Sequence, residues 1–87
     1  MKVVHCKKAR YSVYIGRPSV FGNPFVIGRD GTREDVIRKF EQYAHANLLE
    51  QIGQLPEDAV LGCWCAPLAC HGDVIVKIWH EVHGSGL

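Results

Sequence analysis

The stretch AVLGCWCAPLACHGDVIVKIWHEV, residues 59–82, determines most of the fold that we expect for this chain of 87 residues. Its first part, residues 59–65, is apolar without a break, which is typical of a strand buried on both faces of a sheet. Pro67 then ends the strand. Further on, apolar residues recur at helical spacing and predict a helix over about residues 72–83. They are Ile75, Ile78, Trp79 and Val82.

Two further strands and a helix are predicted upstream of this stretch. Residues 2–5 (KVVH) and 11–16 (YSVYIG) are short and rich in Val, Tyr and Ile, as strands are. Residues 17–31 are rich in Gly and Pro, so we expect a loop there. The sequence TRED at residues 32–35 has the pattern of a helix capping box, and the apolar spacing after it predicts a helix over residues 32–49.

The order of these elements predicts a small single α/β domain that spans residues 1–87. A chain of this length has room for one hydrophobic core. The connection through the first helix is long enough to place the strands on either side of it in parallel. We therefore expect a short, mostly parallel sheet of three or four strands, with helices at about 32–49 and 72–83 packed on it.

The composition limits the class of protein. Ten Lys and Arg against nine Asp and Glu give a net charge of +1, which is too balanced for nucleic-acid binding through bulk charge alone. The basic residues are uneven, because Asp30 is the only acid among the first 30 residues. No apolar run approaches the roughly 18 residues of a membrane span, and the N-terminus lacks the apolar centre of a secretory signal. We expect a soluble, cytoplasmic protein that binds no membrane.

A cluster of thiols is the strongest chemical signal in the sequence. The thiol cluster consists of Cys63, Cys65, Cys70 and His71. A reducing cytoplasm disfavours disulfides, which leaves three interpretations. In the first interpretation, the four side chains form a Cys₃His zinc site, although the spacing C-x-C-x₄-C-H differs from the usual C-x₂-C pair. Alternatively, Cys65 or Cys70 is a reactive thiolate that His71 or Asp73 assists, or the thiols are simply buried.

The loop after the second predicted strand offers an anion site. Gly16 permits close approach of the backbone to a ligand, and the Arg17 guanidinium can hold a phosphate or carboxylate through two hydrogen bonds. Asn23 precedes a proline, which favours extended backbone and an outward amide. The same pattern also suits an ordinary Gly/Pro turn with a solvated arginine.

Two segments, VYIGRPSVFGNPFVIGRDGTRE at residues 13–34 and GCWCAPLACHGDVI at residues 62–75, resemble a bacterial and phage family known as domain of unknown function 4326. The family pattern combines an I-G-R segment, a G-N-P-F segment and a C-x-C-x-P-x-x-C-H-G-D segment. Ala69 departs from the proline expected beside Cys70. The resemblance covers almost the whole chain and implies that the two segments meet in one cleft, but it implies no particular reaction.

Together these patterns predict a zinc-binding loop next to a cleft for a small phosphate-bearing ligand, either a nucleotide or a nucleic-acid component. Arg17 engages the anion beside Gly16 and Asn23, and the thiol cluster holds zinc. Asn23 and Asp73 are the candidate catalytic residues, which orient substrate or water, and the sequence leaves open whether the protein is an enzyme. Two alternatives are a metal-free cysteine enzyme and a non-catalytic, zinc-stapled interaction module. The latter would suit a phage protein that acts on a host factor in the host cytoplasm.

Overall fold

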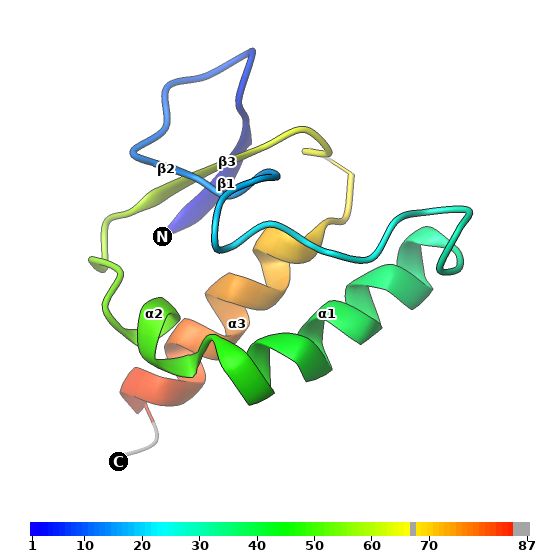
Figure 1. Ribbon diagram of the computed structural model, residues 1–87. Coiled ribbons are helices and arrows are strands. Elements are labelled where there is room, and N and C mark those ends of the chain that lie inside the picture. Colours follow the sequence, from blue (N-terminus) through cyan, green and yellow to red (C-terminus); the bar gives the residue numbers. More distant parts are fainter. Residues whose placement is uncertain (67, 85–87) are drawn as a thin grey trace.

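Figure 1 presents the computed structural model, which describes residues 1–66 and 68–84. Three strands form one sheet in the order β1-β3-β2. They are β1 (Lys2–His5), β2 (Val13–Tyr14) and β3 (Val60–Cys63). Both outer strands run parallel to β3, in a register that pairs Lys2 with Val60 and Val13 with Leu61. The predicted α/β class with a parallel sheet is confirmed.

Strand β3 is largely buried, as its apolar sequence predicted, but it ends at Cys63 instead of residue 65. The reason is the length of its neighbours. The last hydrogen bonds of the sheet run from Cys6 N to the Cys63 carbonyl (2.8 Å) and from Ile15 N to the Gly62 carbonyl (3.0 Å). Beyond them neither outer strand continues, so the chain turns. Pro67, to which we attributed the end of the strand, lies outside the described residues.

The loop of residues 6–12 carries the chain from the end of β1 back to the start of β2. This return is needed because both outer strands run parallel to β3 between them. The ring of Tyr11 lies against Gly62, where an added Cβ would be 2.6 Å from the Tyr11 Cγ. Glycine at position 62 therefore permits the close crossing of β3.

Three helices lie on one side of the sheet (Figure 1): α1 (Arg33–Asn47), α2 (Leu49–Gly53) and α3 (His71–Gly84). The predicted cap of α1 is present, because Thr32 Oγ1 accepts from Asp35 N (3.2 Å) and Asp35 Oδ2 accepts from Thr32 N (2.9 Å). α3 contacts β1, and α1 and α2 pack against α3. The helices predicted at about 32–49 and 72–83 are thus confirmed, with α2 as a separate piece after the first.

The hydrophobic core lies between the sheet and the helices. Its largest fully buried side chains come from every layer and are Ile15, Phe40, Ile52, Leu61, Cys63, Ile75 and Ile78. Within residues 1–66 and 68–84, no helix has the length and apolar character needed to cross a membrane.

Candidate functional site

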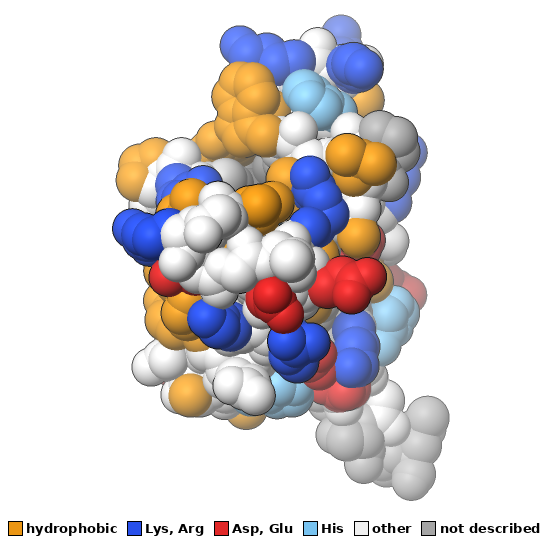
Figure 2. Space-filling view, turned by 90° about the vertical axis from the view of Figure 1, so that its right-hand side faces the viewer, with side chains coloured by type: hydrophobic (Ala, Val, Ile, Leu, Met, Phe, Trp, Pro, Cys, Tyr) orange, Lys and Arg blue, Asp and Glu red, His pale blue; other side chains and the backbone are white. Residues whose placement is uncertain are grey.

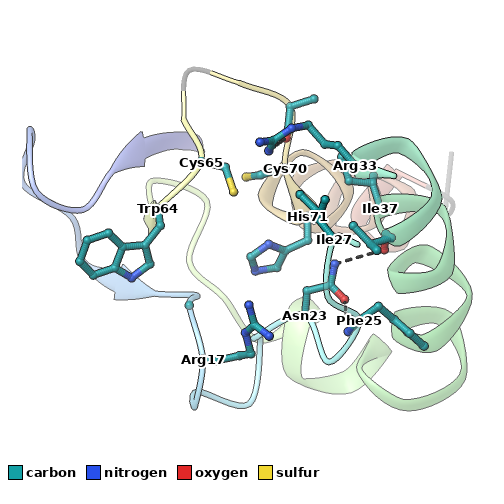
Figure 3. A pocket seen from close by; sticks show the side chains of 13 residues that line it. Arg17, Asn23, Phe25, Ile27, Arg33, Ile37, Trp64, Cys65, Cys70 and His71 are labelled. Atoms are coloured by element: carbon teal, nitrogen blue, oxygen red, sulfur yellow. Dashed lines mark hydrogen bonds between the residues drawn. The ribbon is translucent and has the colours of Figure 1, made fainter. Parts of the chain in front are cut away.

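A cavity of about 120 Å³ opens beside the ends of β2 and β3 (Figure 3). Its walls come from the loop after β2, the start of α1, residues 64–65 and residues 69–71. The lining residues are Gly16, Arg17, Asn23, Phe25, Ile27, Arg33, Val36, Ile37, Trp64, Cys65, Ala69, Cys70 and His71. Open α/β sheets bind their ligands beyond the carboxyl ends of the strands, which is where this cavity lies.

Most of the predicted site residues meet at this cavity. Those that line it are Gly16, Arg17, Asn23, Cys65, Cys70 and His71. Cys63 is buried in the core, and Asp73 lies outside the lining. The two sequence segments that carry the family resemblance therefore do come together in space.

The wall at the end of β2 is held by a chain of hydrogen bonds. Tyr14 OH donates to the Arg17 carbonyl (3.3 Å) and accepts from Trp64 Nε1 (2.7 Å). A Cβ added at Gly16 would be 2.3 Å from the Tyr14 hydroxyl oxygen, so glycine there admits the ring. This chain ties the segment of Arg17 to Trp64, a residue that we had not predicted to belong to the site.

Asn23 lines the cavity, but both ends of its amide are already bonded within the protein. Its Nδ2 donates to the Val36 carbonyl (3.1 Å), and its Oδ1 accepts from Phe25 N (2.9 Å). The side chain therefore fastens the G-N-P-F segment to α1, and this position gives the cavity its shape. An orienting role toward a ligand would require one of these bonds to be shared.

Arg33 is a second arginine at the cavity, which the sequence reasoning missed. Its Nη1 donates to the Ala69 carbonyl (3.0 Å), so it links the first turn of α1 to the loop before α3. In Figure 3 Arg17 and Arg33 lie on opposite sides of the His71 ring. One signal was available: Arg33, Val36 and Ile37 have the i, i+3, i+4 spacing of a single helix face, and all three line the cavity.

Cys70 caps α3. Its Sγ accepts from Gly72 N (3.2 Å), and Asp73 Oδ2 accepts from Cys70 N (3.1 Å). The N-cap thiol thus accepts from the second helical residue, and the carboxylate of the third accepts from the N-cap N–H, an arrangement that resembles a capping box with a thiol in place of the usual hydroxyl. The structure thereby gives Asp73 a partner in the helix cap, which is the ordinary role for an acid in a first helical turn.

Cys70 also contacts Cys63, with 3.2 Å between the two sulfurs. All four cysteines are free thiols. Burial, and secondly the contact with Cys63, raise the pKa of Cys70 to about 12. A thiol with that pKa is protonated at neutral pH, which does not favour Cys70 as a metal-free thiolate nucleophile.

His71 is buried, and its ring is bonded to the chain at the end of β2. Its Nε2 donates to the Ile15 carbonyl (2.7 Å), and its ring packs edge to face against Phe40 at 5.0 Å between centroids. Burial lowers the pKa of His71 below its ordinary 6.5 and is the largest effect. The bond to the Ile15 carbonyl raises the pKa, and the charge of Arg17 lowers it. The imidazole is therefore neutral at pH 7.

The predicted zinc ligands do not surround one point. Two thiolates on a tetrahedral zinc with Zn–S bonds of about 2.3 Å lie about 3.8 Å apart, so the Cys63 and Cys70 sulfurs need only a small shift. The Nε2 atom of His71, however, is already bonded to Ile15. In the part of the chain that the structure describes, no three or more Cys, His, Asp or Glu side chains are arranged to hold a metal ion. The Cys₃His zinc site stays a prediction, in which Nδ1 would be the ligand atom of His71, because Nε2 donates to the Ile15 carbonyl.

Comparison with known proteins agrees with the resemblance seen in the sequence. The chain is similar to an uncharacterized 12.4 kDa protein in the nrdA-td intergenic region of Enterobacteria phage T4, with 32% identity over 87 residues that cover 88% of this chain and 75% of that protein. No solved structure matches it significantly. The family model described as domain of unknown function (DUF4326) matches residues 2–81, so the chain belongs to this family.

Proposed function

We propose that the cavity binds the phosphate group of a nucleotide or of a nucleic-acid component. The observation that carries this proposal is the charge of the lining: Arg17 and Arg33 contribute two guanidinium groups, and no lining residue is acidic. Guanidinium is the side-chain group best matched to phosphate, because its planar fork can donate two parallel hydrogen bonds.

Both arginines retain donors for a ligand. Arg33 uses one of its five N–H groups on the Ala69 carbonyl, and Arg17 has no side-chain hydrogen bond or ion pair within the described residues. The remaining lining includes Phe25, Ile27 and Ile37, which offer apolar contact to the atoms of a ligand that directly adjoin the phosphate. The proposal is one of binding, since Asn23 and Asp73 are committed to bonds within the protein.

Calorimetric titration with 5′-UMP and with uridine tests the proposal. Uridine lacks the phosphate, so we expect it to bind at least about 10-fold more weakly than 5′-UMP, the usual loss for hydrogen bonds to a charged group. Arg17→Ala and Arg33→Ala should each weaken 5′-UMP binding about 10-fold, with the fold checked by circular dichroism. The matched control is Arg38→Ala, because Arg38 pairs with Asp35 on the exposed face of α1 and does not line the cavity.

Equal affinity for the nucleotide and the nucleoside would contradict the proposal, as would full binding by Arg17→Ala. A folded protein that binds neither compound would instead favour the interaction module that the sequence left as an alternative.

Zinc enters this proposal as a separate, structural component. The contact between Cys63 and Cys70, with Cys65 lining the same cavity as Cys70, supports a thiol-based site. Native mass spectrometry of protein purified without added zinc tests it, with one ion per chain as the expected result. A mass equal to that of the bare chain would leave the thiols as buried core and cap residues. Phosphate binding by the arginines does not depend on either outcome.

A further inference from the structure

The cavity is too small to enclose a nucleotide. Pockets that bury a small organic ligand measure about 300–1,000 Å³, whereas this one measures about 120 Å³. It can hold a phosphate or another group of similar size, and the rest of the ligand must lie outside. The part of the ligand outside the cavity contacts the surface around the cavity mouth. The chemistry of that surface therefore indicates which kind of molecule binds.

Trp64 lies on that surface, because it lines the cavity and is nevertheless 55% exposed. Its ring is held in place although it faces water: Nε1 donates to Tyr14 OH (2.7 Å), and the His5 ring packs against it edge to face at 5.9 Å between centroids. Large aromatic side chains normally bury most of their surface. A rigid, exposed indole at the mouth of a cationic cavity is suited to stacking on a nucleic-acid base.

A run of cations begins directly beside Trp64. Lys7 Nζ lies 5.5 Å from the centroid of the Trp64 ring. Lys8 and Arg10 follow it in the loop after β1, and all three side chains are exposed. No acidic side chain pairs with them in the described ranges. In Figure 2 Lys and Arg side chains gather at the upper end of the molecule, where Figure 1 shows this loop, and the acidic side chains lie lower.

The fold fixes this arrangement. Cys6 N donates to the Cys63 carbonyl (2.8 Å), so the loop starts next to the residue that precedes Trp64. Tyr11 then crosses β3 at Gly62. Trp64 therefore connects the arginines of the cavity, with which it shares the lining, to Lys7 at the start of the basic loop.

We infer that the ligand is a single-stranded nucleic acid, with a phosphate in the cavity, a base on Trp64 and the following phosphates on Lys7, Lys8 and Arg10. This inference rests on the proposed function. An unpaired strand is required because the bases of a duplex are stacked on each other and cannot stack on an indole. The net charge of +1 means that binding must come from this local surface and not from the protein as a whole.

Fluorescence anisotropy with labelled rU12, dT12 and a 12-base-pair duplex tests the inference. We expect rU12 or dT12 to bind at least 10-fold more tightly than 5′-UMP and than the duplex, and the RNA and DNA arms show which sugar is preferred. Trp64→Ala should weaken strand binding about 5- to 100-fold, and Trp64→Phe should restore part of the affinity because it keeps a ring for stacking.

Lys7→Ala/Lys8→Ala should weaken strand binding and lower the slope of log K against log[salt] by about 1.4, the value for two phosphate contacts on a single strand. It should leave 5′-UMP binding unchanged. The matched control, Arg38→Ala/Lys77→Ala, also removes two positive charges but from α1 and α3, and should change neither measurement.

The failures of the two proposals are distinguishable. If 5′-UMP binds but the strands bind no more tightly, or the two lysines have no effect, the inference is overturned while the proposed function stands. Strand binding that Arg17→Ala leaves unchanged would place the strand away from the cavity and overturn the inference. If neither 5′-UMP nor a strand binds, both proposals fail.

Discussion

Replacing Cys70 by alanine or serine separates its role in the helix cap from a role in metal binding. In the metal-free protein Cys70→Ala removes the sulfur that accepts from Gly72 N and the contact with Cys63. Loss of an N-cap acceptor costs about 1 kcal/mol, and removal of a buried group the size of a methylene costs about another 1 kcal/mol. We expect the free energy of unfolding to fall by about 2 kcal/mol.

Two further variants separate the contribution of the helix cap from that of the buried sulfur. Cys70→Ser keeps an acceptor for Gly72 N, and serine is a preferred N-cap residue, so the loss should stay below about 1 kcal/mol. Cys63→Ala removes an equally buried thiol that caps nothing, so the loss should be about 1 kcal/mol.

Urea unfolding in the presence and absence of EDTA, followed by circular dichroism, measures all three losses against the wild-type protein. The cap argument would be refuted if Cys70→Ser were as unstable as Cys70→Ala, or if Cys70→Ala were no worse than Cys63→Ala. If zinc is bound through these thiols, all three variants lose the ion and should be destabilised alike, and EDTA should destabilise only the wild type.

Two more predictions concern the cavity wall and the sheet. Because burial lowers the pKa of His71 in the folded state, the unfolded chain takes up a proton first as the pH falls through about 6.5. Stability should therefore decrease below pH 6.5. The variant His71→Gln keeps an N–H for the Ile15 carbonyl but does not titrate, so its free energy of unfolding by urea should change less between pH 7.5 and 5.5. Parallel pH profiles of the variant and the wild type would argue against a lowered pKa of His71. Gly62→Ala places a Cβ 2.6 Å from the Tyr11 Cγ, and we expect a loss of about 1–2 kcal/mol in thermal or urea unfolding. Gly84→Ala, where a Cβ meets nothing within 4 Å, is the control, and equal effects of the two would mean that the crossing is not tight.

The sequence was most informative where the signal is local. The cap of α1 depends on Thr32 and Asp35, three residues apart, and the structure contains both of its hydrogen bonds. The strands at KVVH and in residues 59–65 were predicted from composition over a few positions, and the parallel pairing followed from the length of the connection between them. Even so, the end of β3 was predicted two residues late, because a strand ends where its partners end and the sequence of β3 does not contain that information.

The sequence predicted most of the residues of the candidate site but not the bonds that their side chains make. The sequence identified Arg17, Asn23 and the thiol cluster, and most of these residues line one cavity. It did not reveal that Asn23 is bonded to Val36 or that the His71 ring points toward Ile15. A residue type establishes which bonds a side chain can make, whereas the partners that it finds depend on the packing around it.

By itself, then, this sequence determined where α1, α3 and the strands lie and that the strands pair in parallel, because propensity, periodicity and capping act over a few neighbouring residues. Only the tertiary structure decided that β3 lies in the middle of the sheet and that Arg33 and Trp64 join the cavity. The bonds that build the cavity span long separations in the chain: 36 residues for Arg33 to Ala69, 50 for Trp64 to Tyr14 and 56 for His71 to Ile15. Such contacts form only when the core brings distant segments together, and no local pattern in the chain encodes them.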